Sequence, residues 1–208
     1  MPPPPPAPAG PALVLVPGPL ETPPWWAALP GELRRLGAAA AAVEVPGDPA
    51  PPYAARHVAG AALAIARLAP PAPLLLVAHG AAGPLLPRIG AAQRAAHRPV
   101  AGYLLVDSLL PQPGTPTRAD LRRAQLGTGT AGTPDTPVSG AVPVPDGFDT
   151  EPLPMAADWP DAPCGYLLSD PRLAPCARLA ALRGWPVLDR ADAPAPTAAD
   201  LLDLAARL

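Results

Sequence analysis

Short apolar runs alternate along this chain with longer segments of helical periodicity, and no other property of the sequence limits the fold so strongly. The runs are bounded by Pro and Gly and predict strands over 12–16, 41–45, 74–78, 102–106 and 165–169, with a weaker one over 186–188. Between them, apolar residues recur every three or four positions and predict helices over 30–37, 54–68, 84–96, 172–182 and 197–208. The pattern predicts an α/β fold with a mostly parallel sheet and helices on both faces.

Proline marks the parts of the chain that leave this pattern. It accounts for 38 of 208 residues, several times its usual share of roughly 5%. Segment 1–10 is mostly proline and predicts a disordered polyproline II tail, so the expected single domain is 11–208. Within it, 107–163 is rich in Pro, Gly and Thr, with one helix expected over 117–125. So long a connection predicts a reduced cap or lid over a site.

Composition and charge exclude several kinds of function. The chain has no lysine, which rules out Schiff-base, phosphate-loop and Ser-Lys chemistry. Its 15 arginines are scattered among 17 acidic residues, so we expect no nucleic-acid partner. We see neither a signal peptide nor a long apolar stretch and expect a cytoplasmic protein with no membrane partner. Cys164 and Cys176 are expected as reduced core residues, and we expect no metal and no cofactor.

The residues after the strand at 74–78 carry a resemblance to a known family. They read Ala78-His79-Gly80-Ala81-Ala82-Gly83, a run of small residues before the next expected helix. This segment resembles the nucleophile elbow of the α/β-hydrolase superfamily, in which G-x-S-x-G places a serine on a sharp strand-to-helix turn. Gly80 stands at the nucleophile position, and His79 matches the histidine that often precedes it. The resemblance implies that the turn is kept while its serine chemistry is lost.

Other segments resemble the same superfamily in the same order over 11–208. Residues 13–18, followed by Trp25 and Trp26, resemble an early strand, its His-Gly turn and the start of the next helix. Residues 45–48 are similar to a D-x-P-G turn. Residues 106–114 are similar to the V-D-A-x-x-P-x-x-G segment of small esterases and hydroxynitrile lyases. The resemblance therefore implies an α/β-hydrolase-like fold with a reduced Pro-rich cap.

The other parts of the hydrolase machinery bear on the activity that the resemblance implies. Asp170 stands at the position of the family's acid, but 188–196 contains no histidine at the position of its base. The resemblance places the two N–H donors of the oxyanion hole at Ala81 and Pro19, but a proline has no backbone N–H. These losses argue against an ordinary serine esterase.

The candidate site consists of two carboxylates and a set of pocket residues. Asp170 and Asp107 follow strands at the carboxyl edge of the sheet, where open α/β sheets bind ligands, and are candidate proton shuttles. The candidate substrate-binding residues are Gly18, Pro19, Trp25, His79, Gly80, Ala81, Ser108 and Trp159. The alternative for the two carboxylates and Ser108 is a role in capping turns or in a loop. For the tryptophans, the alternative is packing in the core or lid.

The leading hypothesis is a non-hydrolytic enzyme that guides cyclisation, isomerisation or epimerisation of a natural-product intermediate, as in antibiotic biosynthesis. Its substrate would be a small apolar, polyketide-like or peptide-like molecule in an apolar pocket. One alternative is an inactive pseudo-hydrolase that binds a ligand or a partner subunit, and another is a hydrolase with Asp107 or Ser108 as an atypical nucleophile. A large cavity bounded by Gly80, Asp170 and the cap would favour catalysis or ligand binding. If side chains fill this space, a scaffold role is favoured instead.

Overall fold

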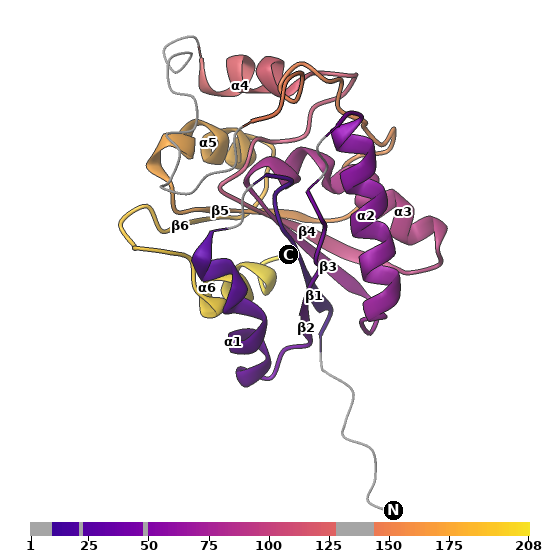
Figure 1. The fold of residues 1–208 in the computed structure, drawn as a ribbon. Helices are drawn as coiled ribbons and strands as arrows, with labels where there is room; N and C mark the ends of the chain where they lie inside the picture. Colours follow the sequence, from indigo (N-terminus) through magenta and orange to yellow (C-terminus); the bar gives the residue numbers. More distant parts are fainter. Residues whose placement is uncertain (1–9, 21–22, 48–49, 128–143) are drawn as a thin grey trace, which may run out of the picture.

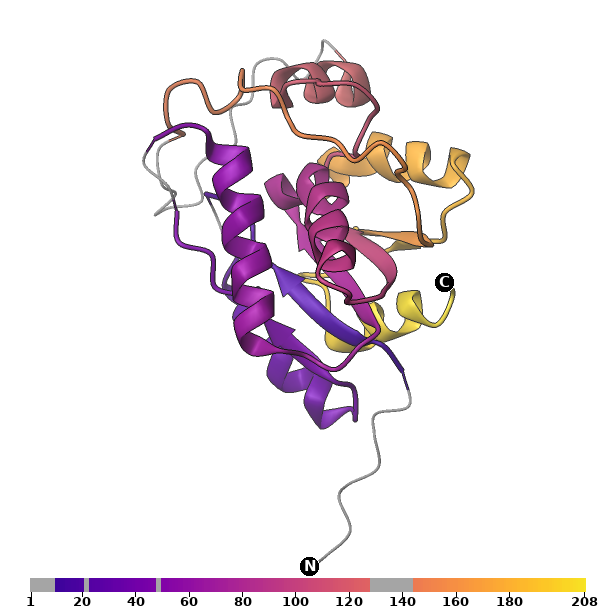
Figure 2. The ribbon, with the colours of Figure 1, turned by 90° about the vertical axis from the view of Figure 1, so that its right-hand side faces the viewer.

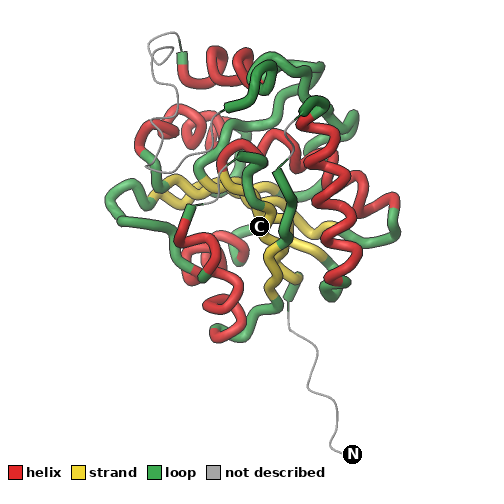
Figure 3. Tube along the Cα trace, viewed as in Figure 1, coloured by secondary structure: helices red, strands yellow, loops and turns green. Residues whose placement is uncertain are grey.

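The computed structural model describes residues 10–20, 23–47, 50–127 and 144–208. The predicted polyproline tail, apart from Gly10, lies outside the described residues. The described chain forms three layers, in which a central sheet is sandwiched between two sets of helices (Figures 1 and 3).

The central sheet has six parallel strands in the order β2-β1-β3-β4-β5-β6. They are β1 (Ala12–Val16), β2 (Ala40–Ala42), β3 (Leu74–His79), β4 (Val100–Val106), β5 (Cys164–Leu168) and β6 (Val187–Asp189). The mostly parallel sheet of the prediction is confirmed. β2 is shorter than the predicted 41–45, because the chain leaves the sheet toward Pro46, which has no N–H for a strand ladder.

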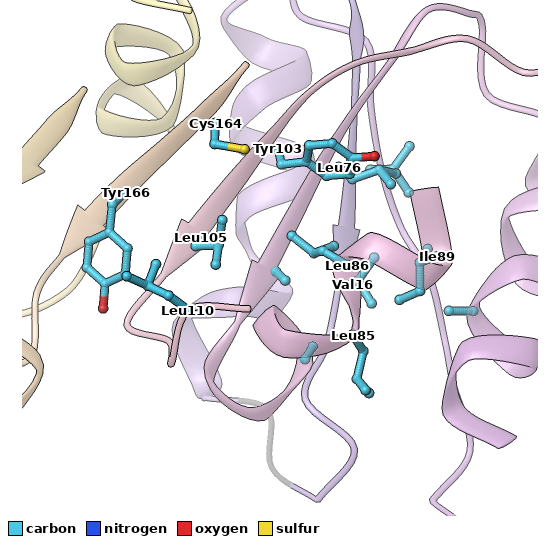
Figure 4. Packing of buried hydrophobic residues seen from close by; sticks show 14 of the residues in the cluster. Val16, Leu76, Leu85, Leu86, Ile89, Tyr103, Leu105, Leu110, Cys164 and Tyr166 are labelled. Atoms are coloured by element: carbon cyan, nitrogen blue, oxygen red, sulfur yellow. The ribbon is translucent and has the colours of Figure 1, made fainter. Parts of the chain in front are cut away.

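Helices cover both faces of the sheet, as predicted. They are α1 (Leu29–Arg35), α2 (Tyr53–Leu68), α3 (Leu86–Ala95), α4 (Arg118–Leu126), α5 (Ala174–Leu182) and α6 (Ala198–Ala205). Buried leucines of α1 and α6 pack on one face. The apolar sides of α2, α3 and α5 pack on the other, with α2 beside α3 (Figure 2). On that second face, Leu76, Leu105 and Tyr166 come from three neighbouring strands, and Leu86 and Ile89 from α3 (Figure 4).

The turn after β3 differs in detail from the prediction. A 3₁₀ segment, η2 (Gly80–Leu85), precedes α3, so the α-helix begins at Leu86 and not at Pro84. Pro84 lies inside the 3₁₀ segment and has no N–H to donate to an α-helical bond. The result is a tight connection that keeps Gly80 at the carboxyl edge of the sheet.

The connection between β4 and β5 contains α4, within one residue of the helix predicted over 117–125. Thr117 and Asp120 form a capping box at its start, which satisfies two N–H groups of the first turn. Gln125 joins this helix to the end of the β4 connection, since its side chain accepts from Leu110 N and donates to Leu110 O, both at 2.7 Å. The predicted cap also includes 128–143, which lie outside the described residues.

A carboxylate from the same connection caps helix α2. Glu151 accepts hydrogen bonds from Tyr53 N at 2.8 Å and from Ala54 N at 3.2 Å. Helix α2 begins after Pro52, which supplies no side-chain cap. The Tyr53 hydroxyl in turn donates to the carbonyl of Asp146 at 3.1 Å. Residues 146–151 are thereby fastened to the N-terminus of α2.

Candidate functional site

The sharp turn at the end of β3 has the backbone geometry that the resemblance implies. Gly80 has φ +56°, a left-handed conformation that costs a residue with a Cβ about 1–2 kcal/mol. A Cβ built at Gly80 would have no described atom within 4 Å. The position that the resemblance assigns to the nucleophile is therefore an open space on a left-handed turn, with no side chain.

Ser108 closes the back of this turn. Its side chain is only 1% exposed, and Oγ lies 2.8 Å from Gly80 O and 2.9 Å from Leu109 O. Its backbone N donates to the Tyr166 hydroxyl at 3.1 Å, and that hydroxyl donates to Ser108 O at 2.9 Å. With its hydroxyl hydrogen bonded to backbone carbonyls, Ser108 supports the turn and is not poised as a nucleophile.

Asp107 links the ends of β4 and β5. Its carboxylate accepts from Ser169 N at 2.7 Å and from Asp170 N at 2.9 Å, and the Ser169 hydroxyl donates to its second oxygen. The residue is buried and has φ +43°, a conformation that Asp tolerates better than most residues. These donors occupy both carboxylate oxygens, so the geometry favours the turn-capping alternative for Asp107.

Asp170 is likewise committed to local structure. Its carboxylate accepts from the backbone N of Arg172 at 2.9 Å and from the guanidinium Nη2 at 2.6 Å. Partial burial alone would raise the pKa of Asp170, but the hydrogen bonds and charge of Arg172 lower it below its ordinary value. A general acid works best with a pKa near the ambient pH, so this environment does not suit a proton shuttle.

His79 and Trp25 are brought together beside the turn. The imidazole contacts the ring of Trp25 edge-on at 5.3 Å and that of Trp26 at 5.8 Å. Burial lowers the pKa of His79, although the charges of Asp107 and Asp170 oppose the shift. Its Nδ1 is buried and has no hydrogen-bond partner among the described residues. His79 is therefore a neutral ring held in an aromatic wall next to Gly80.

Other groups stand where the resemblance places the oxyanion-hole donor and the base of a hydrolase. Gly18 and Pro19 follow β1, and Pro19 has no N–H to pair with that of Ala81 in an oxyanion hole. After β6, Arg190 donates to the Asp200 carboxylate at 2.6 Å. This ion pair lies in the region where the superfamily has its histidine. At the positions that the resemblance assigns to the serine, the base and one oxyanion donor, the chain therefore has Gly80, a segment without histidine and Pro19.

Trp159 lies in a separate aromatic cluster, which favours the packing alternative given for it. Its ring contacts Tyr103 at 4.4 Å and Trp185 at 6.4 Å. Trp159 and Trp185 precede β5 and β6, so the cluster lies toward the amino ends of these strands, away from Gly80. The Tyr103 hydroxyl also donates to Asp161 at 2.9 Å. Trp159 therefore packs against the sheet and does not cover the carboxyl edge.

A small hollow lies near the first turn. It is lined by Pro19, Leu20, Pro46, Tyr53, His57 and Phe148. Its volume is about 10 Å³, close to what one water molecule needs. Neither Gly80 nor Asp170 lines it, so this hollow is not the large cavity that would favour catalysis.

His57 and Arg118 are buried polar residues that sequence reasoning missed. His57 reads as one position of an amphipathic helix, and Arg118 as an ordinary basic residue in the first turn of another. Their positions in the sequence carry no signal that they approach each other. The charge of Arg118 nevertheless contributes to the pKa of His57, which shows that the fold brings them into electrostatic reach.

The buried state of His57 predicts a pH-dependent stability. Burial has the largest effect on the pKa of His57, and the charge of Arg118 adds to it. Together they lower the pKa from 6.5 to about 4, although a hydrogen bond to the backbone of Pro17 acts in the opposite direction. Between these pH values the unfolded chain binds a proton at this residue and the folded chain does not. The free energy of unfolding therefore rises with pH in this window. We expect a loss of about 2 kcal/mol from pH 6.5 to pH 5, at ~1.4 kcal/mol per pH unit.

Urea denaturation at a series of pH values measures this effect. His57→Gln cannot take up the proton and should flatten the dependence between pH 6.5 and pH 5. His97→Gln, at an exposed histidine, is the matched control for the removal of a histidine as such. An equal pH dependence in wild type and His57→Gln would contradict the prediction.

The described ranges contain neither a membrane-spanning helix nor a cluster of metal-binding side chains. Every helix in them is too short or too polar to span a bilayer. The same ranges contain no group of three or more His, Cys, Asp or Glu side chains placed to hold a metal ion. Cys164 and Cys176 are buried free thiols, as predicted.

Comparisons with known proteins bear on the fold. No protein-family model and no curated protein sequence matches the chain. A solved structure that it resembles is an extracellular α/β-hydrolase from a Paenibacillus species, described as sharing structural and functional homology with tobacco salicylic acid binding protein 2. The identity is 18% and the TM-score 0.55, over 86% of this chain and 89% of that chain. A bacterial heroin esterase is similar with 17% identity and a TM-score of 0.48, over 88% of this chain and 65% of that chain. The chain therefore has an α/β-hydrolase-like fold.

Proposed function

We propose that this protein is a pseudo-hydrolase, in which the α/β-hydrolase-like fold serves binding and not ester hydrolysis. The observation that carries the proposal is the state of the nucleophile turn. Gly80 keeps the left-handed backbone of the elbow, while Ser108, Asp107 and Asp170 are bound into hydrogen-bond networks around it. Glycine adopts this turn without the cost that a side chain would add, so the fold keeps the shape of the elbow without its chemistry, which suits a role in binding a ligand or partner.

A second candidate is the non-hydrolytic enzyme that guides cyclisation, isomerisation or epimerisation. One observation favours it: His79 has a buried Nδ1 without a partner among the described residues, beside the open space at Gly80. A neutral imidazole in that place can accept a proton from a bound substrate. The hollow at the first turn has room for about one water molecule and does not reach Gly80, which favours a non-catalytic role as the leading proposal.

Hydrolytic activity tests the leading proposal directly. Purified wild-type protein should show no turnover of p-nitrophenyl acetate or butyrate above the buffer rate, and a fluorophosphonate probe should label no serine. Gly80→Ser should remain inactive as well, because 188–196 supply no histidine at the position of the family's base and Pro19 supplies no oxyanion N–H. Serine at φ +56° should also lower the free energy of unfolding by about 1–2 kcal/mol.

Gly80→Ala is the matched control, since it introduces the same backbone strain without a hydroxyl group. If the Ser and Ala variants are equally stable, the loss of unfolding free energy comes from the backbone conformation and not from the hydroxyl group. Labelling of wild type at Ser108 or Ser169, with hydrolysis abolished by the corresponding alanine variant, would overturn the proposal and favour a hydrolase with an atypical nucleophile.

A further inference from the structure

A second hollow lies at the opposite edge of the sheet from Gly80. It is open to solvent, has a volume of about 230 Å³, and is lined by Arg94, His97, Arg98 and Pro99. These residues join the end of α3 to the start of β4, so they lie at the amino ends of the parallel strands. We call it the Arg98 hollow. At ~30 Å³ for one water molecule, it has room for a small polyatomic ion together with part of an organic group.

The charge of Arg94 is already neutralised within the protein. Its guanidinium forms an ion pair with Asp161, and its Nη1 donates to the Tyr103 hydroxyl at 2.7 Å. That hydroxyl donates in turn to Asp161 at 2.9 Å, which completes a network of three side chains. Arg94 therefore forms one wall of the Arg98 hollow, and an anion in it must be held by the other basic groups.

Arg98 carries a charge that no carboxylate of the described residues offsets by an ion pair. Within that part of the chain its guanidinium has one hydrogen-bond partner, Gln93, whose Oε1 accepts from Nη1 at 3.2 Å. The backbone N of Arg98 also donates to Gln93 O at 2.9 Å. Gln93 is only 1% exposed, so a buried amide holds the guanidinium in place beside the hollow. The remaining guanidinium N–H groups are left to bind a ligand.

His97 holds a backbone conformation that is unfavourable for a residue with a side chain. Helices α1, α3 and α5 end in the same pattern, in which two backbone N–H groups after the helix donate to carbonyls of its last turn. At the left-handed position of this pattern α1 has Gly37 and α5 has Gly184, whereas α3 has His97 with φ +58°. Glycine is the favoured residue there. The retained ring of His97 lines the Arg98 hollow, which gives it a use in binding.

Basic residues near the end of a helix can also serve the helix itself. They can cap its last carbonyls and offset its partial negative charge. In α3, however, the last carbonyls already accept from the backbone N–H groups of Ala96, His97 and Arg98. The side chains of His97 and Arg98 are therefore not needed as caps and are available to a ligand.

We propose that the Arg98 hollow binds a phosphate group, either as the free ion or as the ester of a small organic molecule. Two guanidinium nitrogens of Arg98 match two oxygens of a tetrahedral anion, and the His97 ring supplies an N–H to a third. Arg94 and Pro99 form the walls. This site goes beyond the proposed function, because the loss of hydrolysis at Gly80 requires no ligand at the amino edge of the sheet.

Isothermal titration calorimetry of the full chain with inorganic phosphate, at low and constant ionic strength, tests the proposal. We expect saturable binding with a dissociation constant of about 1 mM, the strength expected for so few atoms. Nitrate, which carries a single charge, should bind about tenfold more weakly. Phenyl phosphate separates the two sources of the group. Tighter binding of this ester than of phosphate assigns the rest of the hollow to an organic group, and weaker binding assigns the site to the free ion.

Variants identify the side chains that hold the ion. Arg98→Gln should weaken phosphate binding about tenfold or more, since it removes the charge and the two-pronged donor. Arg98→Lys keeps the charge and should weaken binding less. His97→Gly removes the ring and the backbone strain together, so it should lower the affinity about threefold while it raises the stability. Arg88→Gln is the matched control, at an exposed arginine of α3 that does not line the hollow.

Three results would overturn the site. The first is the absence of saturable phosphate binding at about 10 mM. The second is equal weakening by Arg88→Gln and Arg98→Gln, which would mean attraction by the surface charge as a whole. The third is a loss of stability in Arg98→Gln with unchanged phosphate affinity, which would assign Arg98 to the end of α3 alone. None of them bears on ester hydrolysis, which the assay at Gly80 and the serines tests separately.

Discussion

Gly83→Ala should be among the most destabilising single substitutions in this protein, with a loss of about 4 kcal/mol in the free energy of unfolding. A Cβ at this position would overlap Ser108 Oγ and lie 2.7 Å from Ser108 Cβ and 3.2 Å from Leu109 O. Overpacking of a rigid core costs about 3 kcal/mol, and displacement of the Ser108 hydroxyl from Gly80 O costs about 1 kcal/mol more. Urea denaturation followed by circular dichroism measures the change.

A double-mutant cycle tests the cause. Ser108→Gly removes the atoms that collide with the new methyl group, so the pair Gly83→Ala and Ser108→Gly should recover about 2 kcal/mol relative to the sum of the single changes. Gly31→Ala is the matched control, since Gly31 lies in α1 with no described atom within 4 Å of the built Cβ. It should stabilise the protein slightly. Wild-type stability of Gly83→Ala would show that the turn is not packed as described.

Asp107→Ala should lower the free energy of unfolding by about 3 kcal/mol. The substitution removes a carboxylate that accepts from two backbone N–H groups and one hydroxyl, each worth about 1–1.5 kcal/mol in a partly buried position. It also places alanine at φ +43°, which is less favourable for Ala than for Asp. Chemical denaturation gives the size of the loss, and Asp107→Asn should lose less because an amide oxygen still accepts and Asn tolerates this φ.

Asp170→Ala separates structure from catalysis. Its carboxylate pairs with an Arg172 side chain that is 64% exposed, so we expect a loss of at most about 1 kcal/mol. A structural role for Asp107 thus predicts a large effect at 107 and a small one at 170. If Asp107→Asn kept full stability but abolished a turnover reaction, the residue would be catalytic, and the second candidate function would replace the first.

The order of the strands and helices could be predicted, because each depends on local properties of the chain. Apolar runs between Pro and Gly identified the strands, and the match at Ala78–Gly83 identified the sharp turn. The left-handed backbone at Gly80 follows from the requirements of that turn. These features are set within a few residues, so the sequence alone contains them.

The partners of the site residues could not be predicted, because they come from distant parts of the chain. Trp159 lies among prolines, which suggested a lid, but the direction of the chain into β5 puts it at the opposite end of the strands from Gly80. Ser108 appeared to be a loop residue, and only its approach to Gly83 and Tyr166 reveals its supporting role. Phe148 lines the first-turn hollow with His57 and lies under the guanidinium of Arg118, an arrangement that helical periodicity does not encode.

The cap on helix α2 has a consequence for the order of folding. The carboxylate of Glu151 lies 98 residues along the chain from Tyr53, whose N–H it accepts. Helix α2 therefore lacks its N-terminal stabilisation until β3, α3, β4 and α4 have been made and residues 146–151 have docked. A contact between such distant residues closes a large loop. We therefore expect the N-terminal cap of α2 to form late in folding, although α2 itself lies early in the chain.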